Sequence, residues 1–132
     1  MYQASAENWG DSRFVITTRH SSFVTDTQGK GANPVDTLLG SLCSCMGHYV
    51  HDHFVAKGTP LSTFRVSAEC DTSPDAERIP EIAVRIDLGP VHLERSEEAA
   101  LLEAIGKCKI YGTLRQACHV HVVVGNGEGR LT

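Results

Sequence analysis

Alternation of apolar and polar side chains predicts β-strands in both halves of the chain, and a longer period predicts helices between them. Residues 82–88 alternate most clearly, as in a half-buried strand. Similar patterns predict further strands at 2–7, 14–19, 22–25, 64–70 and 118–124. We expect helices over 96–108, with Ser96 as its N-cap, and over 109–116, and a loose tail over 125–132. Strands grouped before and after helices are typical of an α+β fold with antiparallel pairing.

The longest predicted element is a central helix that begins at Pro34. Asn33 and Pro34 supply an N-cap and a proline at the first helical position. Gly58, followed by Pro60, predicts that the helix ends after Lys57. Such a helix is about 36 Å long, which is close to the diameter of a compact chain of 132 residues. We therefore expect it to cross the whole protomer.

Neither long face of this helix carries Lys, Arg or Glu, although a helix side that faces solvent normally does. The small residues on one face also permit another helix to approach closely. We therefore predict that a second copy of the chain covers that face, in a homodimer. The apolar arc comprises Leu38, Leu39, Leu42, Cys43, Met46, Tyr49, Val50 and Phe54, and the small or weakly polar arc comprises Gly40, Ser41, Ser44, Gly47, His48 and His51.

The composition is that of one globular domain, expected over residues 1–132, with 41% hydrophobic residues. A net charge of −4 without a basic cluster argues against a nucleic-acid partner. No apolar run is long enough for a membrane span and no secretory signal is visible, so we expect a cytoplasmic protein. The five cysteines then favour reactive or metal-binding thiols over disulfides. Cys70 and Cys118 each fall on the apolar face of a predicted strand and are expected in the core.

Two cysteines lie close together on the central helix. The helical wheel places Cys43 in the apolar arc, as a core thiol, and Cys45 about 160° away. His48 follows Cys45 by three residues, where an imidazole could favour the thiolate, and Asp52 could orient that imidazole. Alternatively, Cys45 is a small interface residue and His48 is an ordinary surface histidine.

A metal site is another hypothesis. His119 and His121 are two residues apart on a predicted strand and so point to one side. Cys45, His48, His51 or Cys108 could supply further ligands. Solvated polar alternation is the more common explanation of such a histidine pair, and we predict no metal.

Two stretches resemble the OsmC/Ohr superfamily of osmotically inducible and organic hydroperoxide resistance proteins, which act in stress responses. Residues 31–46 (GANPVDTLLGSLCSCM) are similar to the family's helix signature of Gly-x-Asn-Pro, Leu-Leu, small residues and a cysteine. Residues 104–114 (AIGKCKIYGTL) are similar to its Lys-Cys-Pro stretch, which supplies a second cysteine. The resemblance implies an OsmC-like α+β fold in which antiparallel sheets wrap the long central helices of an intertwined dimer.

The resemblance also implies a thiol peroxidase that reduces organic hydroperoxides with two cysteines, a dithiol reductant and no cofactor. Carried over by position, Cys45 is the peroxidatic cysteine and Cys108 the resolving one. The first thiolate becomes a sulfenic acid, which the second thiol condenses to a disulfide. A dithiol then restores both thiols by exchange.

The chain departs from the family pattern around these cysteines. Val35 stands where the family has a Glu, with Asp36 one step along, and the family's loop arginine is missing. Lys109 replaces the proline after the second cysteine. Arg19 and His48 are therefore our candidates for activating the thiol. The alternative function is a non-enzymatic dimeric protein of the same fold that binds a small ligand or senses redox state without turnover.

Overall fold

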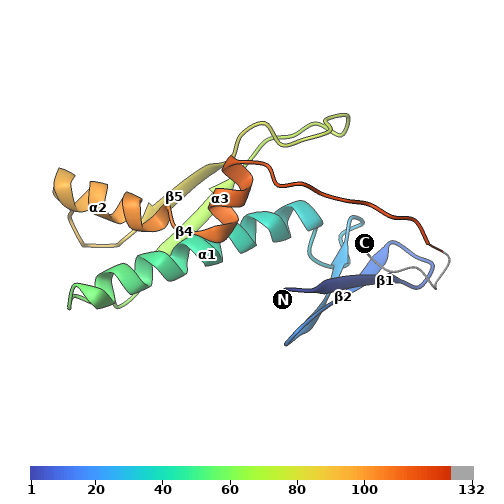
Figure 1. Ribbon diagram of the computed structural model, residues 1–132, viewed down its shortest axis with the longest axis horizontal. Coiled ribbons are helices and arrows are strands. Elements are labelled where there is room, and N and C mark those ends of the chain that lie inside the picture. Colours follow the sequence, from blue (N-terminus) through green and yellow to red (C-terminus); the bar gives the residue numbers. More distant parts are fainter. Residues whose placement is uncertain (126–132) are drawn as a thin grey trace.

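The computed structural model describes residues 1–125, which form two small antiparallel sheets and three helices (Figure 1). The predicted α+β class with antiparallel strands is confirmed. Residues 126–132, which include most of the predicted tail, lie outside the described residues. In chain order the elements are β1 (Ala4–Asn8), β2 (Arg13–Thr18), β3 (Ser22–Asp26), α1 (Pro34–Ala56), β4 (Arg65–Glu69), β5 (Ala83–Asp87), α2 (Arg95–Ile105) and α3 (Lys109–Arg115).

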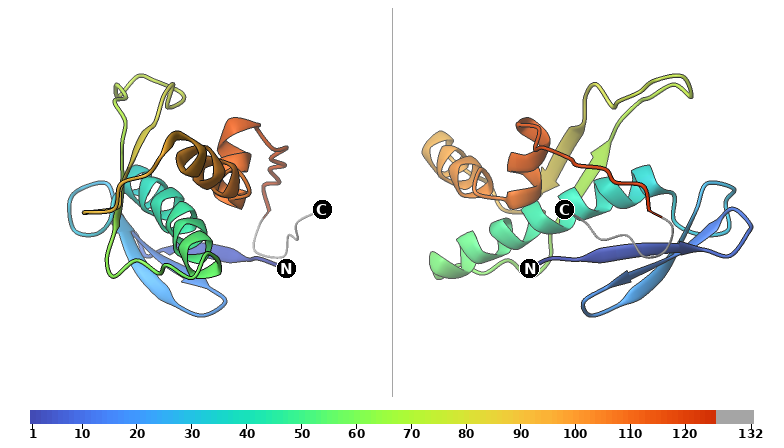
Figure 2. Two further views of the ribbon diagram at one scale, coloured as in Figure 1. Left: turned by 90° about the vertical axis from the view of Figure 1, so that its left-hand side faces the viewer. Right: turned by 45° about the vertical axis from the view of Figure 1, so that its right-hand side comes forward.

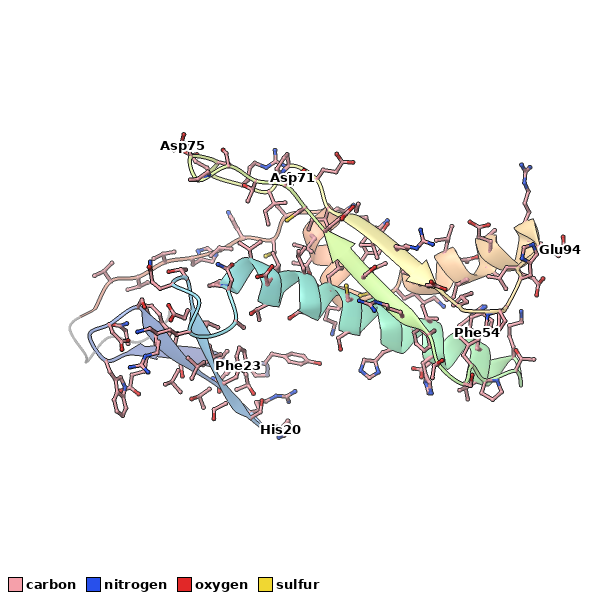
Figure 3. The ribbon with its side chains drawn as sticks, turned by 180° about the vertical axis from the view of Figure 1, so that it is seen from behind. His20, Phe23, Phe54, Asp71, Asp75 and Glu94 are labelled. Atoms are coloured by element: carbon pink, nitrogen blue, oxygen red, sulfur yellow. The ribbon has the colours of Figure 1, made fainter. Side chains whose placement is uncertain are left out.

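The two sheets lie on different parts of α1. The first sheet has the order β1-β2-β3 and stands beside the N-terminal end of α1, whereas β4, β5, α2 and α3 gather around the rest of it (Figures 1 and 2). Val15 pairs with Val24 in the first sheet, and Val66 pairs with Ile86 in the second. Figure 3 shows Phe54 on α1 and Glu94 before α2 at one end of the molecule, and His20 on the distant β2–β3 turn. Within residues 1–125, the strand side chains that pack on the core cluster come from the second sheet and not from the first.

Both predicted ends of α1 are confirmed. The Asn33 side chain accepts a hydrogen bond from the Val35 N–H at 2.8 Å, and Pro34 occupies the first turn. Lys57 is the C-cap, and Gly58 takes a positive φ of 76°. Although α1 has 23 residues, no helix within residues 1–125 is apolar enough to cross a membrane.

The core is a single cluster between α1, α2 and the start of α3. Buried residues recur every fourth position on α1, which gives one stripe facing the other helices and the β4–β5 sheet. Cys108 belongs to this cluster, with 1% of its surface exposed. One of the candidate thiols is therefore a core residue. The cluster contains Leu42, Met46, Val50, Phe54, Leu101, Ile105 and Cys108.

The prediction that Ser96 caps the second helix is wrong. Glu94 is the N-cap of α2, and its N–H donates to Glu97 Oε1 at 3.0 Å. The helix therefore begins one residue earlier than the serine. Glu94 and Ser96 are both polar, and Glu94 is the cap because its backbone N–H donates to the Glu97 carboxylate.

The prediction of a strand over 118–124 is also wrong for the single chain. Residues 117–125 run extended across the molecule without pairing to either sheet (Figure 1). Val120, Val122 and Val124 are 76%, 80% and 91% exposed, and Cys118 is exposed instead of lying in the core. The alternating pattern is present, but no sheet edge of the same chain lies against it. An extended segment becomes a strand only when its backbone groups find a partner.

Candidate functional site

The structure brings Cys45 and Cys108 into direct contact. The two sulfur atoms lie 2.7 Å apart, although 63 positions separate the residues in the sequence. Cys45 comes from the middle of α1, and Cys108 is the N-cap residue of α3. Both are free thiols here. Two thiols in contact form a disulfide with little movement once one of them is oxidised.

The two thiols have different surroundings. Cys108 is almost fully buried, and its Sγ accepts a hydrogen bond from the Tyr111 N–H at 3.5 Å. Burial raises the pKa of the Cys108 thiol, and the neighbouring Cys45 raises that pKa further. Cys108 therefore stays protonated and donates its S–H to Cys45 Sγ. Cys45 is only half-buried, so it is the thiol that a small molecule reaches.

The predicted roles of Cys43 and Cys45 in the core are reversed. Cys45 packs against the core cluster, whereas Cys43 is half-buried outside it. The buried stripe runs through Leu42 and Met46, and Cys45 lies on the side of that stripe that faces Cys108. Burial raises the pKa of the Cys43 thiol. The helical wheel placed Cys43 in the apolar arc and Cys45 about 160° away from it, and it could not show which side of the helix α3 covers.

The predicted arrangement around His48 is not formed. His48 is exposed and its imidazole makes no hydrogen bond to any described residue. Asp52, expected to orient it, instead pairs with His51 Nδ1 at 3.0 Å, and that pair is exposed. His48 still follows Cys45 by three helical positions, so it lies one turn away on the surface of α1.

Arg19 lies next to the β2–β3 turn and is exposed. Its guanidinium stacks over the Tyr2 ring, 4.6 Å from the ring centroid, and the Lys109 Nζ lies 5.6 Å from the same centroid. No hydrogen bond or ion pair links Arg19 to either cysteine within residues 1–125. Arg19 and Lys109 thus share one aromatic ring, and Lys109 directly follows Cys108.

The glycine-rich loop before α1 is held by backbone contacts that fix where the helix begins. The Asp26 carboxylate accepts from the N–H groups of Gln28 at 2.8 Å and Lys30 at 3.1 Å. These hydrogen bonds, led by the one from Gln28, lower the pKa of Asp26. A Cβ on Gly31 would lie 3.0 Å from the Val24 carbonyl oxygen, so only glycine fits against β3 without a shift. The loop thereby fixes where α1 begins, and with it the position of Cys45 in the structure.

Two hollows flank Tyr111. The larger, about 690 Å³, lies between β5 and α2, and the smaller, about 370 Å³, lies between the start of α1, α3 and the segment before β5. The Tyr111 side chain lines both hollows. Its backbone contact with Cys108 was not foreseen. The spacing of three residues from an N-cap is the signal that predicts it.

The two histidines of the metal hypothesis do lie on one side of their segment. The rings of His119 and His121 are 5.0 Å apart between centroids. However, no group of three His, Cys, Asp or Glu side chains within residues 1–125 is arranged to hold a metal ion. The expected ligands on α1 are therefore not brought to the histidine pair.

Comparison with known proteins gives a consistent picture of the fold. The family model described as "OsmC-like protein" matches residues 27–123, whereas no curated protein gives a match. An OsmC-like protein from Mycoplasma pneumoniae superposes with a TM-score of 0.76 at 17% identity, over 89% of each chain. A putative osmotic stress induced and detoxification response protein from Psychrobacter arcticus gives 0.73 at 17% identity, over 86% of this chain and 88% of that one. An organic hydroperoxide resistance protein OsmC from Legionella pneumophila gives 0.60 at 16% identity, over 88% of this chain and 90% of that one.

Proposed function

We propose that this chain, which belongs to the OsmC-like protein family, is a thiol peroxidase that reduces organic hydroperoxides through Cys45 and Cys108. The observation that carries the proposal is the 2.7 Å contact between the two sulfur atoms. A similar fold in a protein named for organic hydroperoxide resistance supports it.

The chemistry needs only these two thiols and a dithiol reductant. The Cys45 thiolate attacks one oxygen of the O–O bond, so that an S–O bond forms, the O–O bond breaks and the alcohol leaves after taking up a proton. The Cys108 sulfur then attacks the Cys45 sulfenic acid, which forms the disulfide and releases water. A dithiol reduces this disulfide by exchange and becomes a disulfide itself. We place the cycle in the cytoplasm, where such reductants keep thiols reduced.

The surroundings of the two thiols support Cys45 as the residue that attacks first. The S–H of Cys108 points at Cys45 Sγ, and a hydrogen bond to the charged form favours a thiolate there. Cys108 is buried with a raised pKa, so it remains a neutral thiol until Cys45 is oxidised. The order of the two steps follows from this asymmetry.

The proposal also includes a positive charge that favours the Cys45 thiolate, and Arg19 or His48 would supply it. Arg19 is held on Tyr2 beside Lys109, which adjoins Cys108. Its guanidinium stays charged at every relevant pH. His48 lies one helical turn from Cys45. Either group would replace the charge that the family's missing arginine provides.

We also propose that the protein works as a homodimer. Its accessible surface is 10708 Å², against the roughly 6,800 Å² expected for a folded monomer of this mass. Phe14, Phe23 and Val24 of the first sheet are each about 40% exposed, and α1 leaves Ser44 and His48 uncovered. Large apolar side chains left open on one sheet, in a chain with so large a total surface, are expected where a second copy packs. Light scattering should give twice the chain mass at micromolar concentration, and a stable folded monomer would refute the dimer.

The alternative function is a dimeric protein that binds a small ligand or senses redox state without turnover. The observation in its favour is Val35, an apolar residue where the family has a Glu. Such a protein would be oxidised once by hydroperoxide and would not cycle with a dithiol.

Turnover of cumene hydroperoxide in the presence of a dithiol tests the proposal. We expect the wild type to consume cumene hydroperoxide faster than hydrogen peroxide, because apolar side chains surround the site. Cys45→Ser should abolish turnover, and Cys108→Ser should leave Cys45 as a sulfenic or over-oxidised acid. Cys43→Ser is the matched control, since it changes the same residue type on the same helix and should spare activity. Turnover that survives Cys45→Ser would rule the proposal out.

A further inference from the structure

The smaller of the two hollows beside Tyr111 has an apolar floor and a positively charged rim. Its floor is formed by side chains such as Leu42, which is 3% exposed, and Ile82. Its rim carries Arg78 and Arg115 against one carboxylate, Glu81. We call it the Arg115 pocket. It is lined by Leu38, Leu42, Arg78, Ile79, Pro80, Glu81, Ile82, Val84, Tyr111, Leu114 and Arg115.

One of the two rim cations is held in place. The Arg115 guanidinium stacks over the Tyr111 ring, 4.1 Å from its centroid, and an Nη atom of Arg115 donates to the Gly106 carbonyl at 3.5 Å. The ion pairs found within residues 1–125 are Arg13 with Asp11, His51 with Asp52 and Lys57 with Glu97. Neither rim arginine is therefore neutralised by a carboxylate of the described chain. The rim of the pocket is therefore positively charged, although the protein as a whole has a net charge of −4.

The larger hollow lacks this charge bias. Its charged lining residues are Arg85, Asp87 and Glu98, two carboxylates against one guanidinium. Its charged lining is net negative and does not favour an anion. Of the two hollows, the smaller is therefore the one that favours a negatively charged ligand.

We propose that the Arg115 pocket binds an amphipathic monocarboxylate, with its alkyl chain on the apolar floor and its carboxylate at Arg115 and Arg78. The volume of about 370 Å³ is at the lower end of the range for small-molecule sites. A guanidinium fixed by stacking on an aromatic ring offers a carboxylate two parallel N–H donors. The apolar floor excludes strongly hydrated small anions, which carry no surface to bury.

The pocket shares a wall with the thiol pair. Tyr111 lines it, and the Tyr111 N–H donates to Cys108 Sγ. Leu42 lies at its floor one helical turn before Cys45. A bound ligand thus touches Tyr111, which contacts Cys108, and Leu42, which lies one turn from Cys45 on α1, although the binding itself needs no peroxide chemistry.

Calorimetry with octanoate, and with 1-octanol as its uncharged counterpart, tests the pocket on the reduced full-length protein. We expect one octanoate per chain, bound at least about tenfold more tightly than 1-octanol, since hydrogen bonds to a charged group are stronger than those between neutral groups. Arg115→Gln should reduce that preference to within about twofold. Arg85→Gln, which removes the arginine of the larger hollow, is the matched control and should leave it unchanged.

Equal affinities for octanoate and 1-octanol would overturn the proposal, as would equal losses in the Arg115→Gln and Arg85→Gln proteins. Because the assay contains no hydroperoxide, its outcome is independent of whether the protein is a peroxidase.

Discussion

Replacing the buried thiol, Cys108→Ala, should change how the stability of the protein depends on pH. Cys108 is 1% exposed and its pKa is raised by burial, so the folded protein keeps this proton at a pH where the unfolded chain has lost it. Between the ordinary thiol pKa near 8.5 and the higher folded value, the unfolded state binds fewer protons than the folded state. The free energy of unfolding therefore falls as the pH rises through that window.

The size of the effect has an upper limit set by one proton. The wild type should lose up to about 1.4 kcal/mol per pH unit through Cys108 above pH 8.5. Cys108→Ala removes this loss. At pH 7 the same variant should be less stable by about 1–3 kcal/mol, since the Tyr111 N–H loses its acceptor.

Urea unfolding at pH 7, 8, 9 and 9.5 measures both quantities, with a phosphine reductant present and one protein concentration throughout. Cys43, whose pKa is also raised by burial, contributes to both proteins. The difference between their slopes therefore reports on Cys108 and on its contact with Cys45. If the free energy of unfolding depends on pH in the same way in wild type and Cys108→Ala, burial does not keep the Cys108 thiol protonated.

Three further changes test how the site is built. Asn33→Ala should destabilise the protein by about 1 kcal/mol in urea unfolding, because the Val35 N–H loses its cap, while Asn33→Asp should stay near wild type. Gly31→Ala should lower the melting temperature, because its Cβ would lie 3.0 Å from the Val24 carbonyl oxygen, whereas Gly112→Ala, which meets no atom within 4 Å, should not lower it. Alkylation of Cys45 as a function of pH should slow in Arg19→Ala or in His48→Ala, whichever group supplies the cation, and unchanged rates in both would discard the activation proposed here.

The ends of α1 could be predicted because local chemistry decides them. Asn33 and Pro34 start a helix whatever surrounds them, and Gly58 ends it by taking a conformation that other residues avoid. The α+β class followed from the strand and helix periods in the same way. These features depend on a few neighbouring residues.

Other features depend on contacts between distant segments and were not predictable. The pattern of residues 118–124 fits a strand, but no sheet edge of the same chain lies against it, and an alternating sequence does not say which chain its partner edge belongs to. Cys43 and Cys45 both flank the buried stripe of α1, and only the position of α3 shows which of them meets Cys108. The pairing itself came from the family resemblance, since spacing along the chain does not place residues 63 positions apart.

Peptide mapping by mass spectrometry, after treatment with one equivalent of cumene hydroperoxide, tests the central claim most directly. The claim is that Cys45 and Cys108 form one redox pair. We predict a disulfide between these two cysteines in the wild type, with Cys43, Cys70 and Cys118 still reduced. A disulfide between Cys43 and Cys108, or Cys45 over-oxidised while Cys108 stays reduced, would contradict the account.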